Sequence, residues 1–183
     1  MMTHVVVRLL TLLALVSVAC AATSVDGKAD LNKALAALTA TGKYNVYLSF
    51  FRLSGLQPVL ARYIQTQPVT MLVPSDNAFT ILPVRVKAQL SGSKLVRLLN
   101  YHMIIQQLPF SSLKKLPPDS KLPTIYGVQI VKQKTTISTV TLGPPGATTS
   151  QMAVVTRSDI AASSLTLIWV HGINNVIIPP GLF

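Results

Sequence analysis

Residues 70–79 have the sequence TMLVPSDNAF and join a predicted strand to a predicted helix. Val69–Val73 is a short apolar run, which is typical of a strand buried on both faces. Pro74 is expected to end that strand. Ser75 and Asp76 carry side-chain oxygens of the kind that cap a helix N-terminus, so we expect them to start a helix at this point. The stretch predicts a strand–turn–helix unit at the centre of the fold.

Three helices are predicted before this unit. Apolar residues recur at helical spacing over 31–38, and Gly42 is expected to end that helix. The same pattern over 44–51 predicts a second helix. Pro58 is expected to open a third helix that runs to residue 64, because proline is tolerated at the first helical position.

The second half of the chain is predicted to be mostly strands. Ser93 is expected to cap one more helix, and Gly143–Ser150 is expected to be a hairpin loop. The residues that indicate the helix and the strands are Leu95, Leu98 and Leu99, then Val128, Ile130, Ile137, Val140 and Leu142, then Leu165, Leu167 and Trp169. Helices followed by strands predict an α+β domain. We expect Leu72, Phe79 and Trp169 to share its core.

The composition excludes several classes of site. The chain has 183 residues, which suits one domain of roughly 100–150 residues plus a leader. Its five acidic residues are all Asp, and its one Cys is Cys20. No Gly-x-Ser-x-Gly element or Gly-rich phosphate loop is present, and His102 and His171 are far apart with no helical partner. We therefore expect no enzyme, no metal and no cofactor.

The N-terminus predicts secretion. Leu9–Ala19 is an apolar run, and Ala19-Cys20-Ala21 follows with the small-residue spacing of a signal-peptide cleavage site. We assign residues 1–22 to a signal peptide, 28–180 to the domain and 181–183 to a short tail. A lipid-modified Cys20 is the weaker alternative. We expect no transmembrane segment, no GPI anchor and no N-glycosylation, since the chain contains no Asn-x-Ser/Thr sequon.

Three segments, taken together, resemble the fasciclin (FAS1) domain family. Residues 70–79 are similar to its first signature, T-x-x-x-P-x-D-x-A-F, and Tyr101-His102 resembles its central Tyr-His pair. Residues 170–179, VHGINNVIIP, are similar to its closing signature, V-H-x-I-D-x-V-L-x-P, with Asn174 in place of the usual Asp. The signature residues that we expect to be structural are Thr70, Pro74, Asp76, Ala78, Phe79, His171, Ile173 and Pro179.

The resemblance implies a compact domain in which strands are wedged against a cluster of helices. It also implies a non-enzymatic role in extracellular adhesion or in organising a matrix or cell wall, and single-domain plant fasciclin-like secreted proteins are the most similar members. Tyr101 and His102 are candidate adhesion residues, as are Asp159 and Ile160, where the family often has an Asp-Ile dipeptide. The alternative for His102 is a buried, hydrogen-bonded imidazole.

The charge balance indicates a second kind of partner. Sixteen Lys and Arg face five Asp, a net charge of +11, and a leader containing Arg8 and no acid would take this to +10. Most of these cations must therefore face solvent without an acidic partner. The candidates for binding a polyanion are Arg85, Lys87, Lys94, Arg97, Lys114, Lys115 and Lys121. An extracellular protein and an anionic polysaccharide both remain open as partners, while secretion argues against nucleic acid.

Overall fold

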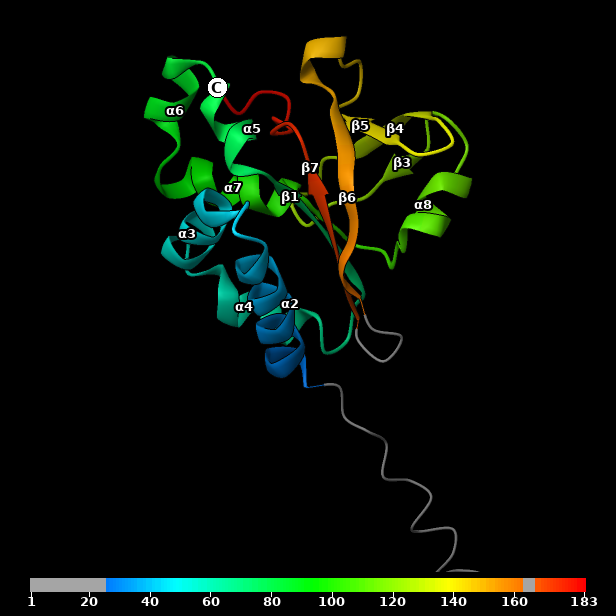
Figure 1. Cartoon of the computed structure of the whole chain (residues 1–183). Helices are drawn as coiled ribbons and strands as arrows, with labels where there is room; N and C mark the ends of the chain where they lie inside the picture. The colour runs from blue at the N-terminus through cyan, green and yellow to red at the C-terminus, as the bar shows by residue number, and fades with distance from the viewer. Residues whose placement is uncertain (1–25, 163–166) are drawn as a thin grey trace, which may run out of the picture.

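The computed structural model describes residues 26–162 and 167–183, so the predicted signal peptide and Leu165 lie outside the described residues. Helices occupy one side of a twisted sheet, and one short helix lies on its other side (Figure 1). The predicted α+β class, with a wedge of strands against a cluster of helices, is confirmed.

The helices partly follow the predicted pattern. They are α2 (Gly27–Thr41), α3 (Asn45–Leu53), α4 (Leu56–Tyr63), α5 (Asp76–Thr80), α6 (Val84–Gln89), α7 (Gly92–Tyr101) and α8 (Phe110–Lys115). Pro58 does not open α4, which begins two residues earlier, after Gly55 in the left-handed conformation. Ser93 lies inside α7, whose N-cap is Ser91. The short helices α6 and α8 were not predicted.

The strands form one seven-stranded sheet. They are β1 (Val69–Pro74), β2 (Met103–Ile104), β3 (Lys121–Leu122), β4 (Ile130–Thr135), β5 (Val140–Gly143), β6 (Ala153–Ala162) and β7 (Ile168–Ile173). Their order across the sheet is β2-β1-β7-β6-β5-β4-β3. Val128 and Ile137 lie outside the strands, and Ile137 is 97% exposed between β4 and β5. The predicted hairpin loop does join β5 to β6, which pair antiparallel.

β1 and β7 pair in parallel, whereas the other neighbouring strands pair antiparallel. The register places Leu72 opposite His171 and Pro74 opposite Ile173. Parallel strands end at the same edge of a sheet. The residues that follow β1 and β7 therefore lie next to each other, although about 100 positions separate them in the chain.

Two apolar cores lie on opposite faces of the sheet. The larger core joins α2–α7 to one face and includes Met71, Val73 and Phe79. The smaller core lies under α8 and includes Leu72, because successive residues of β1 point to opposite faces. The expectation that Leu72, Phe79 and Trp169 share one core is therefore wrong. Trp169 is only half-buried and belongs to neither cluster.

Gly27, the first residue of α2, permits the close approach of α2 to α4. A Cβ at this position would overlap the backbone carbonyl oxygen of Ala61. We expect Gly27→Ala to destabilise the domain by about 1–3 kcal/mol, because the two helices must separate to relieve the overlap. Ala36→Ser, which adds one atom at an exposed position of α2, is the control. Urea denaturation measures both, and equal midpoints would contradict the close packing.

Candidate functional site

Thr70 and His171 hold the loop between β2 and α8. The Thr70 hydroxyl donates to the carbonyl of Gln106 at 2.7 Å and accepts from the backbone N–H of Leu108 at 3.0 Å. Nε2 of His171 lies 2.7 Å from the Leu108 carbonyl. Thr70 and His171 are fully buried on the paired strands β1 and β7, so they attach this loop to the centre of the sheet.

Asp159 is bound by the same group of contacts. Its backbone N–H donates to Nδ1 of His171 at 3.0 Å, so the ring is the neutral tautomer that carries its proton on Nε2. Asp159 has a φ of 49° within an irregular part of β6. Its carboxylate accepts from the backbone N–H of Phe110, the first residue of α8, at 3.2 Å. Burial lowers the pKa of His171, against the raising effects of the Leu108 carbonyl and of Asp159.

The candidate adhesion residues do not form one exposed surface. Tyr101 and His102 are 0% and 1% exposed, so neither side chain is accessible to a partner. Nε2 of His102 accepts from the backbone N–H of Ile177 at 3.1 Å, and Nδ1 lies 2.8 Å from the carbonyl of Leu98. The contacts support the structural alternative for His102, whose pKa burial lowers to about 4. Ile160 is half-buried, while Asp159 is exposed.

Asp76 caps a helix, but a different helix from the predicted one. Its Oδ1 accepts from the backbone N–H of Val46 at 2.8 Å, and its Oδ2 accepts from the Asn45 side chain at 3.1 Å. Both residues lie in the first turn of α3. The helix that follows Asp76, α5, has Ser75 at its N-cap and no side-chain cap. The expectation that Ser75 and Asp76 cap α5 with their side chains is therefore wrong.

The other signature residues are buried at the ends of β1 and β7. They are Pro74, Ala78, Phe79, Ile173 and Pro179. Phe79 contacts Phe50 edge to face, with ring centroids 5.5 Å apart. Asn174, which departs from the family pattern, follows β7 and accepts from the backbone N–H of Val154 at 2.7 Å through its Oδ1.

The candidate polyanion-binding residues fall into two groups on different parts of the molecule. Arg85, Lys87, Lys94 and Arg97 lie on α6 and α7. Lys114 and Lys115 lie on α8, across the sheet from α6 and α7 (Figure 1), and Lys121 lies on β3, the strand at one edge of the sheet. Lys94 and Lys114 are half-buried against aromatic rings, and the other five residues are exposed. Within residues 26–162 and 167–183, the one Lys or Arg paired with an acidic side chain is Lys33, which contacts Asp30, so both groups lack acidic partners.

One neighbouring lysine does not belong to this surface. Lys132 on β4 is 1% exposed, and its ammonium donates to the carbonyls of Lys114 and Leu116 at the end of α8. The sequence pattern, which places it beside Lys134, did not reveal that its role is to hold α8 against the sheet. A cation at a helix C-terminus also interacts favourably with the helix dipole.

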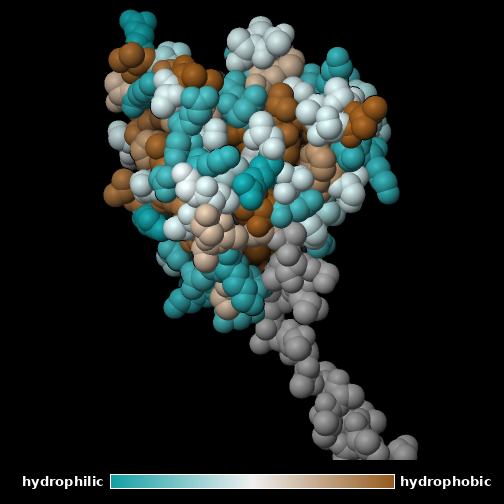
Figure 2. All heavy atoms as spheres, viewed as in Figure 1, coloured by the Kyte–Doolittle hydropathy of each residue, from teal (hydrophilic) through white to brown (hydrophobic). Residues whose placement is uncertain are grey.

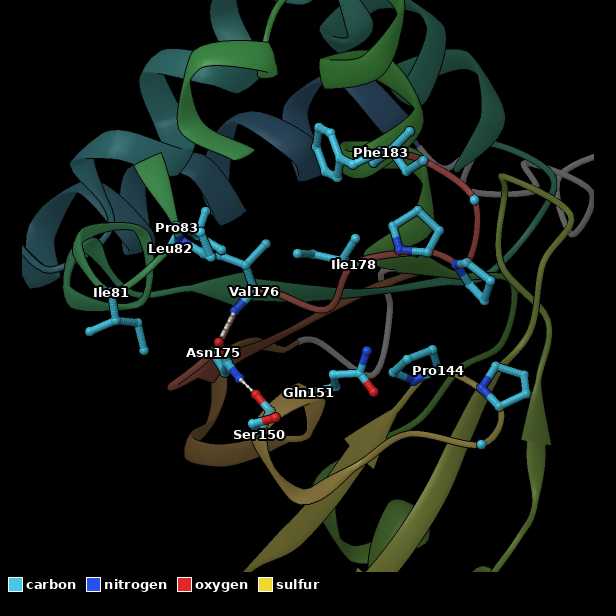
Figure 3. Close-up of a pocket in the computed structure, with 16 residues that line it drawn as sticks. Ile81, Leu82, Pro83, Pro144, Ser150, Gln151, Asn175, Val176, Ile178 and Phe183 are labelled. Carbon is cyan, nitrogen blue, oxygen red and sulfur yellow. Dashed lines mark hydrogen bonds between the residues drawn. The ribbon is translucent and has the colours of Figure 1, made fainter. Parts of the chain in front are cut away.

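A groove of about 630 Å³ separates α5 and the start of α6 from the β5–β6 loop (Figure 3). The C-terminal residues form its floor and one wall. Its apolar lining is Ile81, Leu82, Pro83, Pro144, Pro145, Val176, Ile178, Pro179, Pro180, Leu182 and Phe183. Asn175 donates to the Ser150 carbonyl at 3.0 Å and accepts from the Val176 N–H at 2.9 Å, which fixes the edge of the groove.

Exposed apolar side chains continue from this groove. Ile81 is 61% and Val84 81% exposed, and Phe183 lies under the Lys94 ammonium, 5.3 Å from the ring centroid. In Figure 2, hydrophobic atoms gather over α6 and are interrupted by hydrophilic side chains. In the part of the chain that the structure describes, no helix is long and apolar enough to span a membrane, and no cluster of His, Cys, Asp or Glu has the size of a metal site.

Comparisons with known proteins agree on one family. Residues 42–179 match the family model described as the fasciclin domain. A FAS1 domain-containing protein of Selaginella moellendorffii is 31% identical over 108 residues, which are 59% of this chain and 37% of that protein. The chain thus spans little more than a third of the curated relative that it matches.

The fold also matches a solved structure, that of a FAS1 domain pair from the insect cell adhesion molecule fasciclin I. The TM-score is 0.57 at 19% identity, covering 77% of this chain and 47% of that one. At this identity the likeness concerns the fold.

The capping role of Asp76 predicts that its substitution destabilises the protein more than substitution of the neighbouring Ser75. Asp76→Ala is expected to cost about 1–2 kcal/mol, because the Val46 N–H loses its acceptor at the start of α3. Ser75→Ala is expected to cost less than about 0.5 kcal/mol, because the Ser75 side chain makes no capping bond. Chemical denaturation of the two variants tests the assignment, and a larger loss for Ser75→Ala would contradict it.

The buried neutral imidazoles predict acid sensitivity. Because folding lowers the pKa of His102 from 6.5 to about 4, the unfolded chain binds more protons between these values. The free energy of unfolding should be constant above about pH 6.5 and fall below it, with a slope near pH 5 of about 1.4 kcal/mol per pH unit for each such histidine. His171 should act in the same direction.

Urea titrations between pH 7.5 and 5 measure this slope. His102→Gln should be less stable at pH 7.5 but should lose less stability on acidification than the unsubstituted protein. Parallel slopes in the two proteins would mean that His102 is not the group that titrates.

Proposed function

Because this chain belongs to the fasciclin domain family, we propose that it is a secreted, non-enzymatic protein that contributes to cell adhesion or to the organisation of an extracellular matrix or cell wall. Fasciclin domain proteins are generally adhesion and matrix proteins found outside the cell or at its surface. The signal peptide predicted over residues 1–22 supports export.

The hydrogen bonds of the signature residues support the non-enzymatic part of this proposal. Thr70, His102 and His171 are buried, and both ring nitrogens of each histidine are occupied by backbone groups. A general base must lie within hydrogen-bonding reach of its substrate. These polar side chains are therefore committed to the fold and are not free to act on a bound molecule.

The groove beside the C-terminus carries the adhesion proposal. It combines an apolar, proline-rich lining with exposed Ile81 and Val84 on the adjoining surface. Arg85 and Lys87 lie on the same helix as Val84, and no acidic residue lines the groove. Apolar patches with a polar rim are typical of protein interfaces. The complementary partner is an extracellular protein segment that presents apolar side chains flanked by acidic ones.

A second function is favoured by the unpaired cations on both sides of the sheet. Attraction between clustered Lys or Arg and a polyanion is long-ranged and needs no exact geometry. Arg85 and Arg97 can add bidentate contacts to carboxylates, while the lysines act as hydrated point charges. In this alternative the protein is retained in the wall or matrix by acidic polysaccharide.

Retention in the wall of plant cells that express the full chain distinguishes the two functions. The retained protein should begin between Ala21 and Ser24. If charge holds it, most should elute as salt rises from 0.1 to 1 M, because the Debye length falls from about 10 Å to about 3 Å. Reversal of Lys114, Lys115 and Lys121 to Glu should shift elution to lower salt.

Reversal of Lys28, Arg52 and Arg62 to Glu is the control, since it changes the net charge equally at exposed positions on α2–α4. Equal shifts for both triple variants would contradict a specific role for the α8 group. Retention that survives 1 M salt but is lost in an Ile81→Ser, Val84→Ser double variant would favour the groove and a protein partner. Retained protein that begins at Met1 would contradict export through a cleaved leader.

A further inference from the structure

A second cleft, of about 730 Å³, lies at the edge of the sheet where the parallel strands β1 and β7 end. Four separate parts of the chain form it: the turn between α2 and α3, the junction of β1 with α5, a part of β6, and the residue after β7. Its lining is Gly42, Lys43, Tyr44, Ser75, Asp76, Asn77, Thr156, Arg157 and Asn174. Its volume falls in the range of about 300–1,000 Å³ that small-molecule sites occupy and exceeds what a bare ion fills.

The free polar groups of this cleft are predominantly donors. The Lys43 ammonium and the Arg157 guanidinium form no ion pair with a described residue. Asn174 uses its carbonyl oxygen to bind the Val154 N–H, which leaves its amide N–H groups free. Asp76 is the one acid in the lining, and both of its oxygens already accept hydrogen bonds from the start of α3. The cleft therefore offers many donors and few free acceptors.

Tyr44 adds to the lining of the cleft a hydroxyl without a partner among the described residues. Its side chain is 2% exposed and lines the cleft, yet its hydroxyl makes no hydrogen bond to any residue that the structure describes. The hydroxyl oxygen itself keeps some contact with solvent, so a ligand in the cleft can reach it. Burial raises the pKa of Tyr44, the charge of Arg157 opposes this rise, and both residues line the cleft. Gly172 makes room for the ring, because a Cβ there would overlap the Tyr44 hydroxyl.

We propose that this cleft binds a single sugar-borne oxyanion, the carboxylate of a uronic acid or a sulfate ester, through Arg157, Lys43 and the Tyr44 hydroxyl. The guanidinium suits such a group because it donates two parallel hydrogen bonds to a planar or tetrahedral oxyanion. The remaining volume and the neutral donors of Ser75 and Asn77 accommodate the sugar hydroxyls. The inference rests on the second function above and adds to it a shaped site that lies outside both basic groups.

Titration of the ¹⁵N-labelled protein tests the site with three probes: a galacturonate trisaccharide, its fully methyl-esterified form and a sulfated disaccharide. We expect saturable binding of one or both acidic sugars, with resonance changes centred on Tyr44 and Arg157. The ester, which lacks the charge, should bind at least roughly tenfold more weakly. Comparison of the two acidic sugars identifies whether carboxylate or sulfate is the preferred oxyanion.

Three substitutions should weaken binding without unfolding the protein. Arg157→Gln removes the guanidinium, and Tyr44→Phe removes a hydroxyl that has no protein partner. Asn174→Asp keeps the acceptor for the Val154 N–H but places a negative charge in the cleft. We expect about a tenfold loss for Arg157→Gln and a smaller loss for Tyr44→Phe. Arg52→Gln, which removes the same charge at an exposed position of α3, should leave the dissociation constant unchanged.

Equal weakening by Arg157→Gln and Arg52→Gln would overturn the site, because it would indicate diffuse attraction alone. Failure of every acidic probe to bind saturably would also overturn it. The second proposed function can fail independently of this site. If wall retention is insensitive to salt while the trisaccharide still binds at Arg157, the binding site in the cleft is supported and charge-driven retention is rejected.

Discussion

Outside the helices and strands, this domain depends on hydrogen bonds between buried polar side chains and the backbone of the loops. Thr70 and His171 fix the loop before α8, and His102 joins the end of α7 to the C-terminal segment at Ile177. A buried group without a partner costs about 1–3 kcal/mol, so each of these side chains fits only one arrangement of the loop that it contacts. The residues that identify the family are thus the residues that fix its loops.

The parallel pairing of β1 with β7 also places the two candidate binding surfaces close together. It brings Ser75–Asn77 beside Asn174, and these residues form one wall of the donor-rich cleft. The next residue, Asn175, lines the apolar groove. One strand pair therefore positions a polar cleft and an apolar groove next to each other, with α5 between them.

Local patterns in the sequence predicted those helices and strands that carry a clear apolar spacing or run within their own residues. The apolar spacing of Leu31–Leu38 and the apolar run at Val69–Val73 correspond to α2 and β1. The helices α6 and α8 were missed because six residues contain too few apolar positions to show a helical period. The side chain of Asp76 has the chemistry of a cap, but which helix it caps depends on tertiary structure.

The binding surfaces were harder to predict for a related reason. Lys43 and Tyr44 lie in one turn and Arg157 lies in a distant strand, and they match no motif, so their convergence follows only from the tertiary structure. The burial of Lys132 likewise depends on α8, which the pattern did not reveal. The excess of cations is the sequence signal that bears on these surfaces. It shows that the chain must have unpaired basic side chains, but it does not show where in the fold they lie.

If the second proposed function holds, the placement of the two basic groups on different sides of one sheet would make the domain bivalent toward long polyanions (Figure 1). A molecule with one cationic face can bind one polymer chain, whereas a molecule with two such faces can bridge neighbouring polymer chains. Once one face is bound, the second meets nearby strands at a high effective concentration, so weak contacts combine into strong avidity. A protein of this design would act as a cross-link whose spacing is set by the width of the domain.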